Sequence, residues 1–100
     1  MWPMRPRFLQ ISYIKEKTDV HSLELYNPSD KLIFNIDIYI YNNIGEKYHY
    51  WLSSLQTKTG KTIYLNNNPG GSLWHFQGEV IKVEIESQNK KQLFVPILIL

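Results

Sequence analysis

The side chains that could carry acid–base or metal chemistry are few and widely spaced in this chain of 100 residues. His21, His49 and His75 form no HxH or HExxH motif, although a metal site needs several ligands that converge on one point. Glu24 and Asp37 lie in the middle of predicted strands, and the sequence places no second carboxylate beside either of them. We therefore predict no metal site and interpret Asp37 as a solvated or cross-strand-paired residue.

Motifs for nucleophilic attack and for phosphate binding are also absent from the sequence. Ser53 and Ser54 lack the Gly-x-Ser-x-Gly elbow that exposes a catalytic serine. The segment 66–71, Asn-Asn-Asn-Pro-Gly-Gly, is the longest expected loop, but it has neither the Lys nor the following helix of a phosphate loop. We expect that the protein is not an enzyme, that it has no catalytic or metal-binding residues, and that it uses no cofactor.

The sequence supports a binding surface better than a catalytic site. The predicted strand at 32–41 would present this surface. Apolar and polar or aromatic residues alternate along this stretch, which is typical of a strand that buries one face. The residues expected on the buried face are Phe34, Ile36, Ile38 and Ile40. The residues expected on the other face are Ile33, Asn35, Asp37, Tyr39 and Tyr41.

A hairpin should pair this strand with residues 47–55 through the three-residue loop Asn43-Ile44-Gly45, in which Gly45 takes a positive φ. Its register matches the apolar faces of both strands, because a shift by one residue would misplace every side chain. The register places Tyr41 opposite Lys47, Tyr39 opposite His49, Asp37 opposite Trp51 and Asn35 opposite Ser53. We call Tyr39, Tyr41, His49 and Trp51, with Lys47 and Asp37, the aromatic face.

Two readings of the aromatic face follow from its mixture of rings and polar groups. Another part of the same chain could cover it, or it could bind a partner, since aromatic residues with a polar tip are enriched at interfaces. Tyr39, Tyr41, His49 and Trp51 are therefore candidate partner-binding residues. Stacking of single-stranded bases on the same rings, or of a sugar on Trp51 or Trp74, is an alternative.

The rest of the chain predicts further short strands separated by turn-forming residues, and no segment has a helical period. The expected ranges are 8–15, 20–26, 62–65, 73–76, 80–86 and 93–100. In 80–86 we expect Ile81, Val83 and Ile85 to point inward and Lys82, Glu84 and Glu86 to point outward, and we interpret 87–92 as a polar turn. We predict an all-β, single-domain antiparallel β-sandwich of about eight short strands, with a small β-barrel as the alternative.

The stretch Leu23 to Tyr48 resembles a pattern common to immunoglobulin-like domains. It contains a strand, an Asn-rich turn, a long alternating strand, a short turn and another strand. The resemblance covers about a quarter of the chain and implies an immunoglobulin-like sandwich. The Cys…Trp…Cys pattern of antibody domains is absent, because the chain has no cysteine.

Composition narrows the class of protein further. A chain of this length forms one domain, which we place at residues 8–100 after an extended arm at 1–7. The absence of cysteine excludes a disulfide framework and favours a cytoplasmic or virion setting over secretion, although the localisation stays open. The net charge of +2 is too small to indicate binding to duplex nucleic acid. No apolar run is long enough to span a membrane as a helix.

Both ends of the chain are candidates for contacts with other protein chains. The arm carries Trp2, Arg5 and Arg7 together with two prolines, and we expect Trp2 to dock on this or another chain. The C-terminal segment 93–100 is apolar on both faces, so it must be buried within the fold or paired with a partner. Its candidate contact residues are Phe94, Ile97 and Ile99.

We therefore predict a non-enzymatic structural or protein-interaction module that is a building block of a larger assembly. The size and composition suggest a viral or phage structural protein. Its partners would be other protein chains, in self-assembly or hetero-assembly, reached through the arm and the C-terminal strand. The alternative function is a single-stranded nucleic-acid or ligand-binding β-domain that uses the face around Tyr39 and Trp51.

Overall fold

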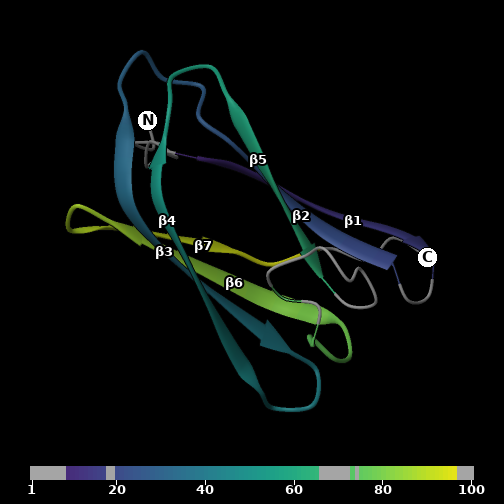
Figure 1. Cartoon of the computed structure of the whole chain (residues 1–100). Coiled ribbons are helices and arrows are strands. Elements are labelled where there is room, and N and C mark those ends of the chain that lie inside the picture. Colours follow the sequence, from purple (N-terminus) through teal and green to yellow (C-terminus); the bar gives the residue numbers. More distant parts are fainter. Residues whose placement is uncertain (1–8, 18–19, 66–72, 74, 97–100) are drawn as a thin grey trace, which may run out of the picture.

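The computed structural model describes residues 9–17, 20–65, 73 and 75–96, which form seven strands (Figure 1). The strands are β1 (Gln10–Lys17), β2 (Val20–Tyr26), β3 (Ile33–Asn42), β4 (Lys47–Leu55), β5 (Gly60–Leu65), β6 (Val80–Ser87) and β7 (Lys90–Phe94).

Two antiparallel sheets account for all seven strands. One sheet has the order β1-β2-β5, and the other has the order β4-β3-β6-β7. The sheets are separate and do not close into a barrel, so the barrel alternative is wrong. The all-β prediction is confirmed, and the arrangement of two sheets is consistent with a β-sandwich.

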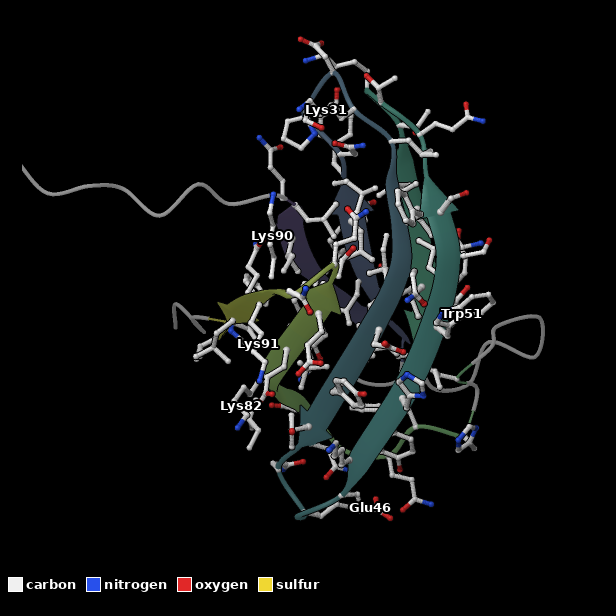
Figure 2. All side chains as sticks on the ribbon, turned by 90° about the vertical axis from the view of Figure 1, so that its left-hand side faces the viewer. Lys31, Glu46, Trp51, Lys82, Lys90 and Lys91 are labelled. Atoms are coloured by element: carbon white, nitrogen blue, oxygen red, sulfur yellow. The ribbon has the colours of Figure 1, made fainter. Side chains whose placement is uncertain are left out.

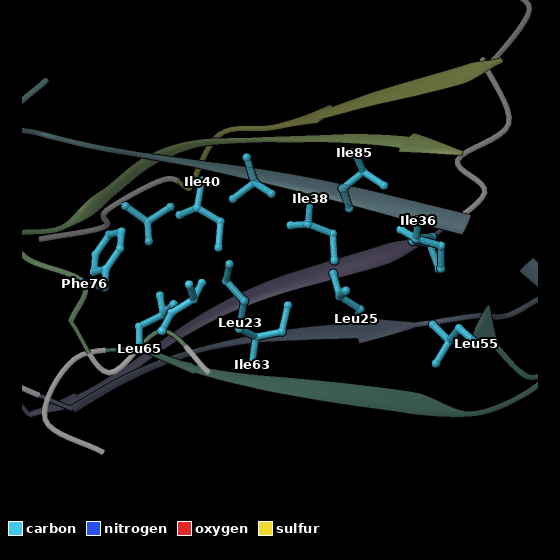
Figure 3. Close-up of a cluster of buried hydrophobic side chains, with 14 of the residues drawn as sticks. Leu23, Leu25, Ile36, Ile38, Ile40, Leu55, Ile63, Leu65, Phe76 and Ile85 are labelled. Carbon is cyan, nitrogen blue, oxygen red and sulfur yellow. The ribbon is translucent and has the colours of Figure 1, made fainter. Parts of the chain in front are cut away.

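The hydrophobic core gathers side chains from both sheets into one cluster (Figure 3). The three-stranded sheet contributes Leu23, Leu25, Ile63 and Leu65, and the four-stranded sheet contributes Ile36, Ile38, Ile40 and Ile85. Phe76, which is 1% exposed, packs at one end of the cluster. Each fully buried aliphatic side chain stabilises the fold by about 2 kcal/mol relative to an exposed one.

The β3–β4 hairpin has the register that the sequence predicts. Tyr41 pairs with Lys47, Tyr39 with His49, and Asp37 with Trp51. The loop glycine, Gly45, has φ = +85°, a conformation that is free of steric cost only for glycine. β3 is one of the two inner strands of the sheet, because β4 pairs with one side of it and β6 with the other.

The expected inward position of Phe34 is wrong. Phe34 is 46% exposed, whereas its neighbour Ile33 is buried opposite Leu55. Asn35 has φ = +55°, and this left-handed residue interrupts the alternation of β3. Ser53 and Ser54 are both exposed at the same level of β4, so both strands change phase together and the pairing register is preserved.

The expected inward position of Ile81 is also wrong, because a β-bulge lies at the start of β6. Tyr41 pairs with Lys82 and the next residue, Asn42, pairs with Val80, so Ile81 is an extra residue without a partner on β3. Val80 consequently points into the core, whereas Ile81 is 50% exposed. Val83 and Ile85 are buried as predicted.

Several strand boundaries differ from the expectations, most clearly at the first strand and at the ranges 73–76 and 87–92. The first strand is Gln10–Lys17 rather than 8–15. The described residues of the range 73–76 form no strand, since Leu73 makes only an isolated bridge to Leu65, and its carbonyl accepts a turn hydrogen bond from Phe76. The range 87–92 contains only a two-residue turn, and β7 already begins at Lys90.

Two buried asparagines form side-chain hydrogen bonds that hold together the segments at the ends of the four-stranded sheet. The Asn42 amide donates to the Glu46 carboxylate (2.9 Å) and to the Gln77 carbonyl (2.8 Å), and its oxygen accepts from the backbone N–H of Glu46 (2.7 Å). The Asn27 amide donates to the carbonyls of Lys31 (2.8 Å) and Leu55 (3.1 Å). These bonds satisfy polar groups that would be costly to bury alone.

Candidate functional site

The aromatic face lies on the outer side of the four-stranded sheet, where the pairing registers arrange its side chains in rows (Figure 2). One row runs Trp51, Asp37, Glu86, Lys91, the next runs His49, Tyr39, Glu84, Leu93, and the third runs Lys47, Tyr41, Lys82. Neighbours in a row are close enough for their side chains to interact. The face therefore combines rings on β3 and β4 with a band of charged groups on β6 and β7.

Trp51 is the most exposed ring of the aromatic face. It is 56% exposed, so it does not lie under another part of the chain as one reading of the sequence expected. Its indole N–H donates to the side-chain oxygen of Asn35 at 2.9 Å. This bond fixes the orientation of the indole while leaving much of the ring in contact with solvent.

Tyr39 and His49 form the centre of the aromatic face. Their rings are stacked with centroids 4.9 Å apart and an interplanar angle of 21°. The His49 Nε2 lies 2.8 Å from a carboxylate oxygen of Asp37, and the Lys47 ammonium lies 4.6 Å from the centroid of the Tyr39 ring. The imidazole is thus held between a ring and a carboxylate, and the cation covers the same tyrosine.

Tyr41 lies beside two cations at the edge of the aromatic face. The ammonium of Lys82 is 4.2 Å from the centroid of its ring, and the ammonium of Lys47 is 5.7 Å from it. Lys82 also forms an ion pair with Glu84 at 3.2 Å. The hydrogen bond from Lys82 lowers the pKa of the Glu84 carboxyl, and Tyr41 and Lys47 lower it further.

An open polar hollow of about 400 Å³ adjoins the aromatic face at the β6–β7 turn. Asn35 and Asp37 of β3 line one side of it, and Glu86 and Lys91 line the other. Both carboxylates already have a partner, because the His49 imidazole lies 2.8 Å from Asp37 and the Lys91 ammonium lies 3.5 Å from Glu86. The hollow is therefore a polar margin of the surface in which both carboxylates have a partner.

The three histidines do not converge. His21 is buried, and its Nδ1 shares a hydrogen bond with the hydroxyl of Tyr13. Burial raises the pKa of the Tyr13 hydroxyl, and the nearby Glu79 carboxylate raises it further. The His75 ring lies against Tyr48, with centroids 5.4 Å apart. Within the described ranges, no three His, Cys, Asp or Glu side chains are placed to hold a metal ion together.

The structure brings together the four candidate residues Tyr39, Tyr41, His49 and Trp51. Phe94 packs against the core, opposite Val83, instead of facing outward. Leu93 and Val95 are 60% and 55% exposed, so this part of the C-terminal segment is not buried on both sides. The remaining candidates, Trp2, Arg5, Arg7, Ile97 and Ile99, lie outside the described residues.

Sequence reasoning missed the contribution of β6 and β7 to this surface. Alternation correctly predicted that Lys82, Glu84 and Glu86 face outward, but it gave no sign of which strand they lie beside. The pairing of β3 with β6 joins segments that are far apart in the sequence, and no turn motif specifies such a register.

Comparison of the chain with known proteins finds no similar protein. No protein-family model, curated protein or solved structure matches the chain. In the part of the chain that the structure describes, no helix is long and apolar enough to cross a membrane.

Proposed function

We propose that the protein is a non-enzymatic protein-interaction module and a building block of a larger assembly, with the aromatic face as a contact surface. The observation that carries this proposal is Trp51, which is 56% exposed but held in one orientation by Asn35. An ordered aromatic ring loses little conformational entropy when a partner covers it, and tryptophan is enriched among residues that dominate binding energy.

We also propose that the fold is immunoglobulin-like. In such sandwiches the first, second and fifth strands share one sheet, and the third, sixth and seventh share the other. The strand order β1-β2-β5 and β4-β3-β6-β7 agrees with this division, and β4 lies beside β3. Many interaction domains use this architecture, although the fold alone does not imply a function.

A protein partner fits the aromatic face better than a single-stranded nucleic acid, the rival function. Bases need accessible rings beside unpaired cations. Here His49 and Lys47 already contact Tyr39, and Lys82 is paired with Glu84. The carboxylates of Asp37, Glu84 and Glu86 also line the face and would repel phosphates. Contacts through the arm and the C-terminal segment, and a virus or phage particle as the setting, stay predictions.

The test measures association of the intact chain by sedimentation velocity over a wide concentration range. We expect a mass above the 11.9 kDa of one chain, and we expect the Tyr39→Ala, Trp51→Ala double variant to sediment closer to one chain. Tyr64→Ala is the matched control, because Tyr64 is an exposed ring, at 47%, on the other sheet. Circular dichroism establishes that each variant is folded.

Titration of a fluorescein-labelled oligo-dT, followed by anisotropy at low and high salt, tests the rival function. We expect no salt-sensitive binding. Tight binding that weakens with salt and disappears in the double variant would overturn the proposal in favour of the nucleic-acid function. A chain that stays monomeric at every concentration would contradict the proposal that the protein assembles with copies of itself.

A further inference from the structure

Strand β4 is an edge of the four-stranded sheet, and among the described residues it pairs only with β3. The backbone N–H of Asn42 donates to the carbonyl of Glu46 at 3.1 Å, which makes these residues a hydrogen-bonded pair. Bonded and non-bonded pairs alternate along an antiparallel ladder. The N–H and C=O groups of Lys47, His49 and Trp51 therefore point away from β3, toward the free side of the strand.

The side chains of β4 do not prevent another strand from pairing with this edge. Edge strands commonly carry charged residues or proline that prevent pairing with another strand. β7 has Lys90 and Lys91 and is followed by Pro96, whereas β4 has a single charged residue, Lys47, at its first position. From Tyr50 to Leu55 every side chain of β4 is uncharged.

The inner face of β4 is also incompletely covered. Tyr48, Tyr50 and Leu52 pack against the core but are only partly buried, in contrast to the fully buried Ile38 and Ile40 opposite them. These three side chains lie at the margin of the sheet, where none of the other described strands shields them. One additional strand beside β4 would bury apolar and aromatic surface together with the free backbone groups.

We propose that the occupant of this edge is β4 of a second copy of the chain, paired antiparallel across a two-fold axis at Tyr50. The proposal rests on the proposed function and names its partner. Exposed and half-buried side chains alternate without interruption from Lys47 to Ser53, and Tyr50 is the middle of this segment. Antiparallel pairing of the whole segment with its own copy fixes one register. It places Tyr50 opposite Tyr50, His49 opposite Trp51, and Lys47 opposite Ser53 of the second copy.

This register is compatible with both the backbone and the charges. It pairs residues whose N–H and C=O groups point outward with residues of the same kind, as an antiparallel ladder requires. Each Lys47 faces a neutral Ser53, so no like charges lie opposite one another. The two aromatic faces would join side by side into one surface, with His49 and Trp51 at the junction.

Position 53 provides a charge test with a matched control, because Ser53 is exposed and a side chain of either charge placed there would remain in solvent within one chain. Ser53→Lys should weaken the dimer roughly fivefold, since a lysine would then face Lys47 twice across the axis. Ser53→Glu should tighten the dimer by a similar factor, because the same positions would then hold opposite charges. Equal dissociation constants of the two variants, measured by sedimentation equilibrium, would overturn the proposed register.

A cysteine cross-link tests the register independently of charge, because the natural chain contains no cysteine. In the Tyr50→Cys variant the two thiols would face each other at the axis, at a Cα separation of about 4.5 Å that permits a disulfide. Tyr64→Cys, on the edge strand β5, is the matched control and should form no disulfide-linked dimer under the same mild oxidation.

The combined outcomes separate the two proposals. An oligomer that dissociates in the Tyr39→Ala, Trp51→Ala variant but forms no disulfide in Tyr50→Cys would overturn the β4 pairing and leave the protein-interaction function standing. A wild-type chain that is monomeric at every concentration would overturn the β4 pairing and also remove the support from self-assembly. A disulfide-linked dimer of Tyr50→Cys, together with the opposite responses of the Ser53 variants, is the expected result.

Discussion

The indole of Trp51 donates its hydrogen bond to Asn35, a residue on the neighbouring strand that has φ = +55°. The exposed ring and the interrupted strand are therefore parts of one arrangement. Asparagine tolerates the left-handed region better than most residues, and its side-chain oxygen supplies the acceptor.

The backbone at Asn35 predicts different costs for two substitutions. Both Asn35→Gly and Asn35→Ala lose the bond to Trp51, but only alanine also carries the steric cost of the left-handed conformation. We expect Asn35→Ala to be less stable than Asn35→Gly by about 1 kcal/mol in urea unfolding. Equal stabilities would contradict the positive φ. Trp51 fluorescence should shift to longer wavelength in both variants.

The buried side chain of Asn27 should be much more important for stability than its exposed surroundings suggest. Asn27→Ala removes the donor for the carbonyls of Lys31 and Leu55, which fix the end of the sheet. We expect a loss of roughly 3 kcal/mol in the free energy of unfolding. Ser29→Ala, which loses its hydroxyl bond to the Asn27 oxygen (2.7 Å), should cost about 1 kcal/mol. A smaller effect at Asn27 than at Ser29 would contradict this assignment.

The β6–β7 turn offers a stabilising change. Gln88 and Asn89 have φ = +50° and +65° between the paired residues Ser87 and Lys90, as in a type I′ turn. Such turns favour Asn followed by Gly, so the double change Gln88→Asn, Asn89→Gly should raise the free energy of unfolding by about 1 kcal/mol. Chemical denaturation measures the gain, and a loss of stability would show that the turn is of another type.

The ion pair of Lys15 and Glu79 predicts a dependence of stability on pH. The hydrogen bond and charge of Lys15 lower the pKa of the Glu79 carboxyl from its ordinary value of 4.5. The folded state thus holds this proton less tightly than the unfolded state, so the contribution to stability is present above pH 4.5 and is lost as the pH falls through the lowered pKa.

Replacing the cation tests this assignment. In Lys15→Gln the pKa of Glu79, followed by NMR of its side chain, should rise toward 4.5, and the stability should fall less between pH 5 and pH 3 than in the wild type. Lys61→Gln, a lysine on the edge strand of the same sheet, serves as the control. An unchanged Glu79 titration would contradict the ion pair.

Local patterns predicted the β3–β4 hairpin well and the long-range arrangement less completely. Alternation on both strands and the position of Gly45 specified the register between Tyr39 and His49, because a short loop leaves few possible pairings. The errors at Phe34 and Ile81 have one physical cause, since a left-handed residue and a bulge each shift the phase of a strand by a residue. Periodicity alone carries no trace of either feature.

Only the part of the candidate site that lies on the β3–β4 hairpin could be predicted from the sequence. Tyr39, Tyr41, His49 and Trp51 share one hairpin, so their grouping followed from the sequence. The charged band on β6 depends on the pairing of Asp37 with Glu86, which tertiary packing decides. The positive φ of Asn35, which bonds to Trp51, could not be predicted from alternation either. Asparagine is uncommon in strands, so its presence there was only a weak sign of an irregular backbone.

The alternation of the chain between its two sheets makes folding a property of the whole sequence. A cut in the turn 56–59 would leave the hairpins β1–β2 and β3–β4 in one fragment and β5, β6 and β7 in the other. Each fragment then holds an incomplete portion of both sheets and of the core that joins them. Neither fragment can bury its apolar surface alone, and each is the complement that the other lacks. The two fragments should therefore fold only when they associate, which is the property that a split reporter requires.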